Sequence, residues 1–403
     1  MKKQLVILGL FGVTVLGTPA FAELFDESLW KSFDVHGFIS QGFLKSDANN
    51  FYADTEDGTF QFHEVGVNFL TNLSDRLHVG MQLFTRDLGD ISNNELVLDW
   101  AYGDYRWNDA FGIRAGKLKV SYGLYNETRD IDAVRTSIFL PQSIYPETQR
   151  DLFNSAYGVE VYGYLDLSSW GYLSYQAQYG GKDITTDSGM VKDLQEDPNQ
   201  DVWQFLKSIQ LKNMMAAGLE WETPLPGLRL KGWYGQTDMV FDLDINDREF
   251  LEGLGIVDRD RLFLRLTDED SDLTILSLEY MRGNWVFAAE YSTGSDEDGR
   301  NEGYYGGVSY RINEWLELGT YYAIFYADVH DRAGRQWKAA GYPDYLAWQK
   351  DLALTARFDL NEHWIVKLEG HLVDGVTGFY FQDNPEGLER NSSLLALKIT
   401  YSF

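Results

Sequence analysis

Segments of about ten residues in which apolar and polar side chains alternate recur from one end of the chain to the other. LHVGMQLFTR, LRLKGWYG, WVFAAEYS and WIVKLEGH are examples. Alternation with a period of two predicts β-strands that have one apolar face and one polar face. The repeated pattern therefore predicts an all-β fold.

The connections between these segments alternate between short and long. Short connections occupy 72–75, 108–110, 166–169, 224–227, 282–284, 313–314 and 361–363. Long connections occupy 46–58, 87–94, 121–156, 180–212, 238–272, 293–302, 326–349 and 375–392. Seven short and eight long connections separate sixteen strands, and strands of ~9–11 residues suffice to cross a bilayer. An even strand number with short turns at one end is typical of outer-membrane barrels. We predict a 16-stranded antiparallel transmembrane β-barrel over 33–403, with short periplasmic turns and long extracellular loops.

The first residues, MKKQLVILGLFGVTVLGTPAFA, have two lysines, a short apolar run and a small-residue cleavage site. This pattern predicts a cleaved signal peptide over 1–22, because the apolar run is shorter than the ~20 residues of a membrane-spanning helix. A periplasmic segment over 23–32 would then lead into the barrel. The expected location is the outer membrane of a Gram-negative bacterium.

The last residues, SLLALKITYSF, read as a strand that continues to the final position. Leu395, Leu397, Ile399, Tyr401 and Phe403 share its apolar face. In a closed barrel this strand must pair with the first one, at about 33–45, since backbone groups in lipid need internal partners. We therefore expect the chain terminus to be hydrogen-bonded.

Tryptophans recur beside the short connections. They are Trp107, Trp170, Trp285, Trp315 and Trp364. Aromatic residues at one level of successive strands predict a girdle at the membrane interface. A β-sandwich or propeller is the alternative, but it would not place its core tryptophans at one end of every hairpin.

Alternation also predicts which side chains face the lumen. The inward set is His78, Arg86, Arg114, Arg229, Lys231, Arg357, Lys367 and Glu369. A charge on the lipid face costs roughly 2–4 kcal/mol, which favours this orientation. Sixteen strands are too many for side chains to fill, so we expect an aqueous channel. Lys117 and Lys119 violate the alternation, which indicates either a β-bulge or a position near the outer interface.

The third long connection, 121–156, mixes charges with apolar residues. Its charged candidates are Arg129, Asp130, Asp132, Arg135, Arg150 and Asp151. A loop folded into the lumen needs apolar residues against the wall and charges toward the pore, so we interpret it as a constriction loop. The alternative is an external loop whose Arg–Asp pairs satisfy one another.

Composition excludes several functions. The formal net charge of −28 argues against nucleic-acid binding, and the chain has no cysteine. No metal-ligand spacing, nucleophile elbow or phosphate loop occurs, so we expect no cofactor, no metal and no enzymatic activity. The acidic stretch 238–272 either contacts lipopolysaccharide through loosely bound divalent cations or is a solvated surface.

Two neighbouring stretches resemble the N-terminal half of the phosphate-selective porin O and P superfamily. They are EVGVNFLTNLSDRLHVGMQLF and LDWAYGDYRWNDAFGIRAGKLKVSYGLYNETRD, within about 60–150. The resemblance implies a 16-stranded porin that commonly forms a homotrimer, with Lys117 and Lys119 near the pore mouth, which favours the bulge. The chain departs from the family at Ser121, where a proline is usual, and it lacks a dense arginine ladder. The resemblance to bacterial porins also implies that Phe403 is an assembly signal for the barrel-assembly machinery.

The expected function is passive diffusion of small hydrophilic or ionic solutes through the barrel. The expected partners of its outer surface are outer-membrane lipid and lipopolysaccharide. Two alternatives stay open at this point. One is a structural barrel whose lumen is blocked or threaded by a partner. The other is an anion-selective porin, which requires basic residues to outnumber acidic ones where the lumen is narrowest.

Overall fold

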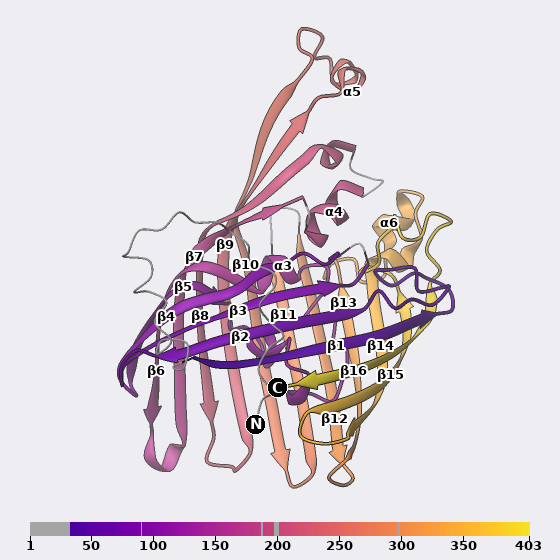
Figure 1. The fold of residues 1–403 in the computed structure, drawn as a ribbon. Coiled ribbons are helices and arrows are strands. Elements are labelled where there is room, and N and C mark those ends of the chain that lie inside the picture. The colour runs from indigo at the N-terminus through magenta and orange to yellow at the C-terminus, as the bar shows by residue number, and fades with distance from the viewer. Residues whose placement is uncertain (1–32, 90, 187, 197–200, 296–298) are drawn as a thin grey trace, which may run out of the picture.

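The computed structural model describes residues 33–89, 91–186, 188–196, 201–295 and 299–403. Sixteen strands form one closed antiparallel barrel in which each strand pairs with the next and β16 pairs with β1 (Figure 1). The predicted fold class is therefore confirmed. The predicted signal peptide (1–22) and periplasmic segment (23–32) lie outside the described residues.

The strands are β1 (Asp34–Ser46), β2 (His63–Asn72), β3 (Leu77–Asp87), β4 (Val97–Asn108), β5 (Phe111–Lys119), β6 (Ser155–Asp166), β7 (Tyr172–Thr185), β8 (Leu206–Glu222), β9 (Leu228–Ile245), β10 (Leu262–Arg282), β11 (Trp285–Ser295), β12 (Arg300–Arg311), β13 (Leu316–Tyr326), β14 (Trp348–Asp359), β15 (Trp364–Gly375) and β16 (Asn391–Ser402). The helices are α3 (Arg150–Phe153), α4 (Gly189–Glu196), α5 (Arg248–Gly253) and α6 (Arg335–Ala339), with short 3-10 turns η2 (Asn126–Thr128), η3 (Asp132–Val134), η4 (Ser168–Trp170), η5 (Asp201–Phe205) and η6 (Asp344–Ala347). No helix in the described part of the chain is long and apolar enough to span a bilayer.

The barrel closes at the last residue of the chain. β1 and β16 pair from Phe38 opposite Ser402 to Ser46 opposite Leu394. The backbone N–H and C=O of Phe403 each bond Gly37, both at 3.0 Å. The final strand therefore has no frayed end, as the sequence pattern predicts.

The outer surface carries the apolar face of each strand. Leu354, Leu372 and Ile39 are more than half exposed there, although they are large and apolar. The predicted girdle residues also lie on this surface beside the tight turns, where Trp285 packs on Tyr310 with ring centroids 4.4 Å apart. A barrel surface of this kind suits a hydrocarbon environment.

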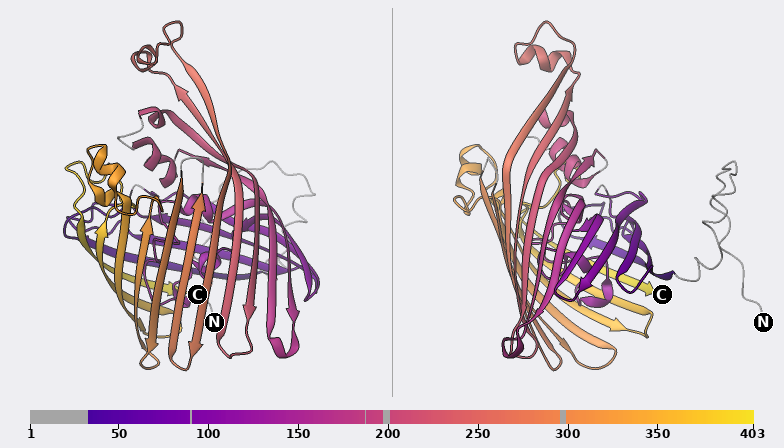
Figure 2. Two further views of the ribbon diagram at one scale, coloured as in Figure 1. Left: turned by 180° about the vertical axis from the view of Figure 1, so that it is seen from behind. Right: turned by 90° about the vertical axis from the view of Figure 1, so that its left-hand side faces the viewer.

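Two predicted loops are wrong in extent. Strand continues into both ends of the stretches 180–212 and 238–272, because β7 continues to Thr185, β8 begins at Leu206, and β9 and β10 extend to Ile245 and from Leu262. These extensions form an arm that rises beyond the barrel and ends at α5 (Figures 1 and 2). The β9–β10 backbone pairing continues to Ile245 opposite Leu262. Acidic residues of the arm form ion pairs across these strands, for example Asp242 with Arg265 at 2.6 Å.

The interior is also less polar than alternation predicts. An apolar cluster lies inside the barrel between β1, β15, β16 and several long connections. It contains Leu44, Phe62, Val373, Leu394 and Phe139, each less than 8% exposed. Inward positions near the extracellular ends of these strands are apolar because loops pack against them rather than water.

Candidate functional site: the loop-lined lumen

Residues 120–154, between β5 and β6, form the loop that dominates the lumen, and we call them loop 3. The side-chain amide of Asn126 donates to the backbone oxygens of Val120 and Phe153, at 2.6 and 3.1 Å. These bonds tie the two ends of the loop together beside its stem. The segment between η2 and α3 is thereby directed across the barrel toward strands far away in sequence.

Asp132 fixes the middle of loop 3 to the opposite wall. Its carboxylate lies 2.9 Å from the Lys398 amine and 3.3 Å from the Lys367 amine, and it accepts a bond from the Thr400 hydroxyl at 2.6 Å. Although burial opposes ionisation, these two lysines lower the pKa of Asp132. The Lys367 and Lys398 side chains are only 1% and 3% exposed, so this charge cluster is sealed from the lumen.

A second attachment uses the backbone of loop 3. The Glu369 carboxylate on β15 accepts the N–H groups of Ile138 and Phe139, at 2.8 and 2.9 Å. It also accepts the Thr355 hydroxyl at 2.6 Å and lies 3.0 Å from a His371 ring nitrogen. A fully buried carboxylate with four partners holds the loop backbone rather than facing solute.

Arg357 and Arg135 complete the attachment at η3. The Arg357 guanidinium donates to the backbone oxygens of Ala133 and Arg135, at 2.7 and 3.2 Å. Arg135 in turn lies 3.5 Å from Asp132 and donates to the backbone oxygen of Arg129. Both arginines therefore stabilise the loop conformation.

Near its stem, loop 3 is held by a buried charge network. The Arg150 guanidinium lies 2.8 Å from Asp130 and 3.2 Å from Asp99, and the Lys119 amine lies 2.8 Å from Asp130. Although burial opposes both shifts, these pairs lower the pKa of Asp130 and raise the pKa of Arg150. The network joins the end of β5 to both ends of the loop.

The neighbouring strand β4 accounts for the positions of Lys117 and Lys119, the two lysines of β5 that break the alternation. β5 and β6 pair without interruption from Gly112 to Lys119, whereas the β3–β4 register shifts so that Asp99 of β4 has no partner on β3. The displaced Asp99 meets Lys119, and Lys117 donates to the backbone oxygen of Leu98 at 2.5 Å. The irregularity therefore lies in β4, and not in β5 where the broken alternation suggested it.

Glu147 lies between two arginines. Its carboxylate is 2.6 Å from Arg86 on β3 and 3.0 Å from Arg129 on the loop. Burial opposes ionisation, but the two guanidinium groups lower the pKa of Glu147 to about 2. Arg86 and Arg129 thus share one carboxylate, and this buried group of three carries a net charge of +1 when all are ionised.

Tyr145 and Glu290 form an attachment that sequence reasoning missed. The Tyr145 hydroxyl donates to Glu290 on β11 at 2.5 Å, and the N–H of Leu124 donates to the same carboxylate at 2.8 Å. Gly123 has φ of +58°, and a Cβ there would lie 2.2 Å from the Tyr145 oxygen. The alternation on β11 places Glu290 on the inward face, and that was the signal available for this contact. Nothing near Tyr145 in the sequence indicates its partner.

The six predicted constriction charges thus have different surroundings. Arg129, Asp130, Asp132, Arg135 and Arg150 are packed between loop and wall in the pairs described above. The Asp151 carboxylate has no ion pair among the described residues, while its backbone oxygen accepts a bond from Lys182. Two Arg–Asp pairs, Arg150–Asp130 and Arg135–Asp132, lie within the loop, as the second interpretation expected. The additional pairing of loop carboxylates with wall lysines was anticipated by neither interpretation.

On the other side of the lumen, inward charges remain partly exposed. Arg114 lies 3.2 Å from Asp104 and 3.1 Å from Glu160. Arg229 lies 2.8 Å from Glu279 and 3.4 Å from Glu220. The two arginine side chains are 29% and 30% exposed. Each guanidinium bridges two carboxylates, so each group of three carries a net charge of −1 when all are ionised.

Two other predicted wall residues lie around these groups. The Lys231 amine is 3.4 Å from the Ser121 hydroxyl at the start of loop 3. His78 is at the turn end of β3, where its ring bonds the Asn72 side chain. By contrast, Arg86, Arg357, Lys367 and Glu369 face inward but are covered by loop 3.

Comparisons with known proteins agree with this architecture. No protein-family model matches the sequence. An uncharacterized protein of Aquifex aeolicus (strain VF5) is 30% identical over 107 residues, which is 26% of this chain and 23% of that protein. The aligned region thus spans about a quarter of the length of that curated relative.

Several solved structures share the whole barrel. Pseudomonas putida OprB has a TM-score of 0.55 and 13% identity over 96% of both chains. Salmonella typhi OmpF, in complex with daunomycin, has a TM-score of 0.54 and 14% identity over 92% of this chain and 97% of that one. Vibrio cholerae OmpT, in a trimer form, has a TM-score of 0.54 and 12% identity over 92% and 99%. The chain therefore has the fold of bacterial outer-membrane porins.

Proposed function

We propose that the protein is an outer-membrane diffusion porin that passes small hydrophilic and ionic solutes down their gradients. The observation that supports this most is the arrangement at Arg114 and Arg229, where each partly exposed guanidinium is held between two carboxylates. When all groups are ionised, the four carboxylates of this wall outnumber its three basic side chains, Lys231 included, and this surplus favours small cations over anions. Loop 3 narrows the lumen from the opposite side.

The sequence resemblance to phosphate-selective porins supports an anion-selective channel as the second candidate. That candidate requires a surplus of basic groups in contact with solute. Here Lys367, Lys398 and Arg150 are buried in ion pairs, and this argues for cation preference instead.

The cellular context is part of the proposal. A signal peptide over 1–22 directs export, and Phe403 supplies a terminal signal to the barrel-assembly machinery. The barrel resides in the outer membrane among lipid and lipopolysaccharide. It assembles as a homotrimer, which the trimer form of Vibrio cholerae OmpT supports by analogy of fold. The aromatic girdle sets the depth of the barrel in the bilayer. It consists of Trp107, Trp170, Trp285, Trp315 and Trp364.

A planar-bilayer recording tests the function. Purified protein is reconstituted, and conductance and reversal potential are measured across a potassium chloride gradient. We expect discrete conductance steps with a reversal potential of cation-preferring sign. An anion-preferring sign would replace the proposal with the phosphate-porin candidate. Absence of steps at high protein concentration would replace it with a blocked or partner-threaded barrel.

A further inference from the structure

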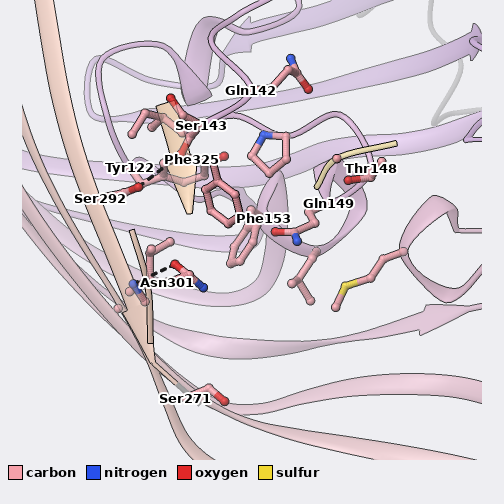
Figure 3. Close-up of a pocket in the computed structure, with 18 of the residues that line it drawn as sticks. Tyr122, Gln142, Ser143, Thr148, Gln149, Phe153, Ser271, Ser292, Asn301 and Phe325 are labelled. Carbon is pink, nitrogen blue, oxygen red and sulfur yellow. Dashed lines mark hydrogen bonds between the residues drawn. The ribbon is translucent and has the colours of Figure 1, made fainter. Parts of the chain in front are cut away.

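A cavity of about 290 Å³ lies on the extracellular side of loop 3 and has no role in the charge arrangement described above (Figure 3). The loop contributes Tyr122, Ser143, Gln149 and Phe153, and the extracellular halves of β8–β14 contribute the facing wall. We call this cavity the outer vestibule. A volume near 300 Å³ is at the lower end of the range for small-molecule sites.

The lining is mainly aromatic and aliphatic. Tyr122, Phe153, Trp233 and Phe325 supply ring surface, and Met214 adds a flexible apolar side chain. Burial raises the pKa of Tyr122 to about 12, so this phenol stays neutral. An apolar lining with a few polar groups is the usual composition of a site for a small organic molecule.

The outer vestibule offers no free charge to a ligand. None of its lining residues is Lys, Arg or His, and only Asp272 and Asp351 are acidic. Both oxygens of Asp351 lie within 3.0 Å of the His371 ring. In the register of β10 and β9, Asp272 lies opposite Gln236. Gln236 is on the outward face of β9, as is Tyr234, whose side chain is 45% exposed. The Asp272 carboxylate therefore belongs to the outer surface.

Polar groups are nevertheless available at the cavity wall. The amide oxygens of Gln349 and Asn301 accept the N–H groups of Gly378 and Gly294, at 2.8 and 3.2 Å. Within the described residues, the amide NH₂ groups of both side chains, and the whole side-chain amide of Gln149, have no protein partner. A side-chain amide can bond a ligand that carries an amide, hydroxyl or carbonyl group.

We propose that the outer vestibule binds uncharged organic molecules that have an aromatic or similarly flat apolar body and one hydrogen-bonding group. This inference rests on the proposed channel function, since it names a solute class that the channel would concentrate before passage. A charged analogue of the same shape would lose its hydration in a cavity without a counter-charge and would bind more weakly.

Benzamide, benzoate and benzamidinium test the proposal because they share one shape and carry charges of 0, −1 and +1. Binding is measured by isothermal titration calorimetry on the full barrel in lipid nanodiscs, and the heat from empty nanodiscs is subtracted. We expect benzamide to bind at least about tenfold more tightly than either ion. Equal binding of all three, tighter binding of an ion, or no binding would overturn the proposal.

Two cavity-filling variants locate the site. Thr148→Trp and Ala323→Leu add volume at two lining positions, one on loop 3 and one on β13, and each should weaken benzamide binding at least about tenfold. Glu220→Gln, on the far side of loop 3, is the matched control and should leave benzamide binding unchanged. Loss of binding in the control but not in the cavity variants would reject the site.

Channel recordings separate this inference from the proposed function. Conductance without benzamide binding would reject the outer vestibule site and retain the porin. Benzamide binding without conductance would retain the site and reject diffusion through the barrel.

Discussion

The two sides of the lumen use inward-facing charged side chains for different purposes. On β15 and β16, Lys367, Glu369 and Lys398 face inward and are buried under loop 3. On β5 and β9, Arg114 and Arg229 also face inward, yet almost a third of each side chain is exposed. We call the first the anchor wall and the second the open wall.

The difference shows that an inward charge in a large barrel is not automatically in contact with solute. At the anchor wall, each charged side chain bonds loop 3, so it contributes to the position of the loop. At the open wall, carboxylates outnumber guanidinium and ammonium groups, so the field reaches the lumen. Mutations at the two walls should therefore affect stability and selectivity separately.

The largest effect is expected from Asp132→Ala at the anchor wall. This change leaves the buried Lys367 amine without its carboxylate, which costs about 3–5 kcal/mol. We expect loop 3 to detach, with faster proteolytic cleavage between 120 and 154 and larger, noisier single-channel conductance. Asp151→Asn is the matched control, because the Asp151 carboxylate has no ion pair in the described structure. Identical behaviour of both variants would contradict the anchor role.

The second-largest effect is expected from acid, which should weaken the attachment of loop 3 to the wall. The pKa of Glu147 is lowered to about 2 against an unfolded value of about 4.3. Its contribution, on the order of 3 kcal/mol, is therefore fully present above pH ~4.3 and is lost as pH falls through about 2. The pKa values of Asp130 and Asp132 are lowered too, so they act in the same direction. Cleavage of loop 3 by pepsin, divided by the rate for an unfolded reference peptide at the same pH, should stay slow at pH 4 and accelerate toward pH 2. Uniform cleavage over this range would show that these carboxylates do not hold the loop.

Glu369→Gln should have an intermediate effect. The amide keeps the shape but cannot accept the N–H groups of Ile138 and Phe139 with both of its polar atoms, so we expect a loss of about 1–3 kcal/mol. Urea unfolding of the barrel in detergent measures this loss. The reversal potential should remain unchanged, since Glu369 is fully covered. A changed reversal potential would place Glu369 in the open lumen.

The smallest free-energy effect is expected at the open wall. Glu220→Lys changes the local charge by two, and a unit charge at ~10 Å in water is worth about 0.4 kcal/mol. The change acts on cations and anions with opposite sign, so the ratio of cation to anion permeability should fall about fifteenfold, with little change in unfolding free energy. Glu220→Gln should give about half of this shift in free energy. A stability loss comparable to that of Asp132→Ala would remove the distinction between the walls.

The barrel itself could be predicted from the amino-acid sequence alone. Strand number, turn positions, closure through Phe403 and the inward orientation of Lys367 and Arg229 all follow from a period of two and from the requirement that backbone groups in lipid be paired. These features depend on neighbours along the chain or on adjacent strands, so local pattern suffices. The extents of β9 and β10 were missed because strand pairing outside the membrane needs no apolar outer face.

Which inward charges meet the lumen could be read only from the folded chain. Alternation describes Lys367 and Arg229 identically, but loop 3 covers the first and leaves the second open. The contact that makes the difference joins Asp132 to Lys367, which are 235 residues apart. No local pattern encodes such a pair, because its energy comes from two buried charges that meet only when the loop has crossed the closed barrel.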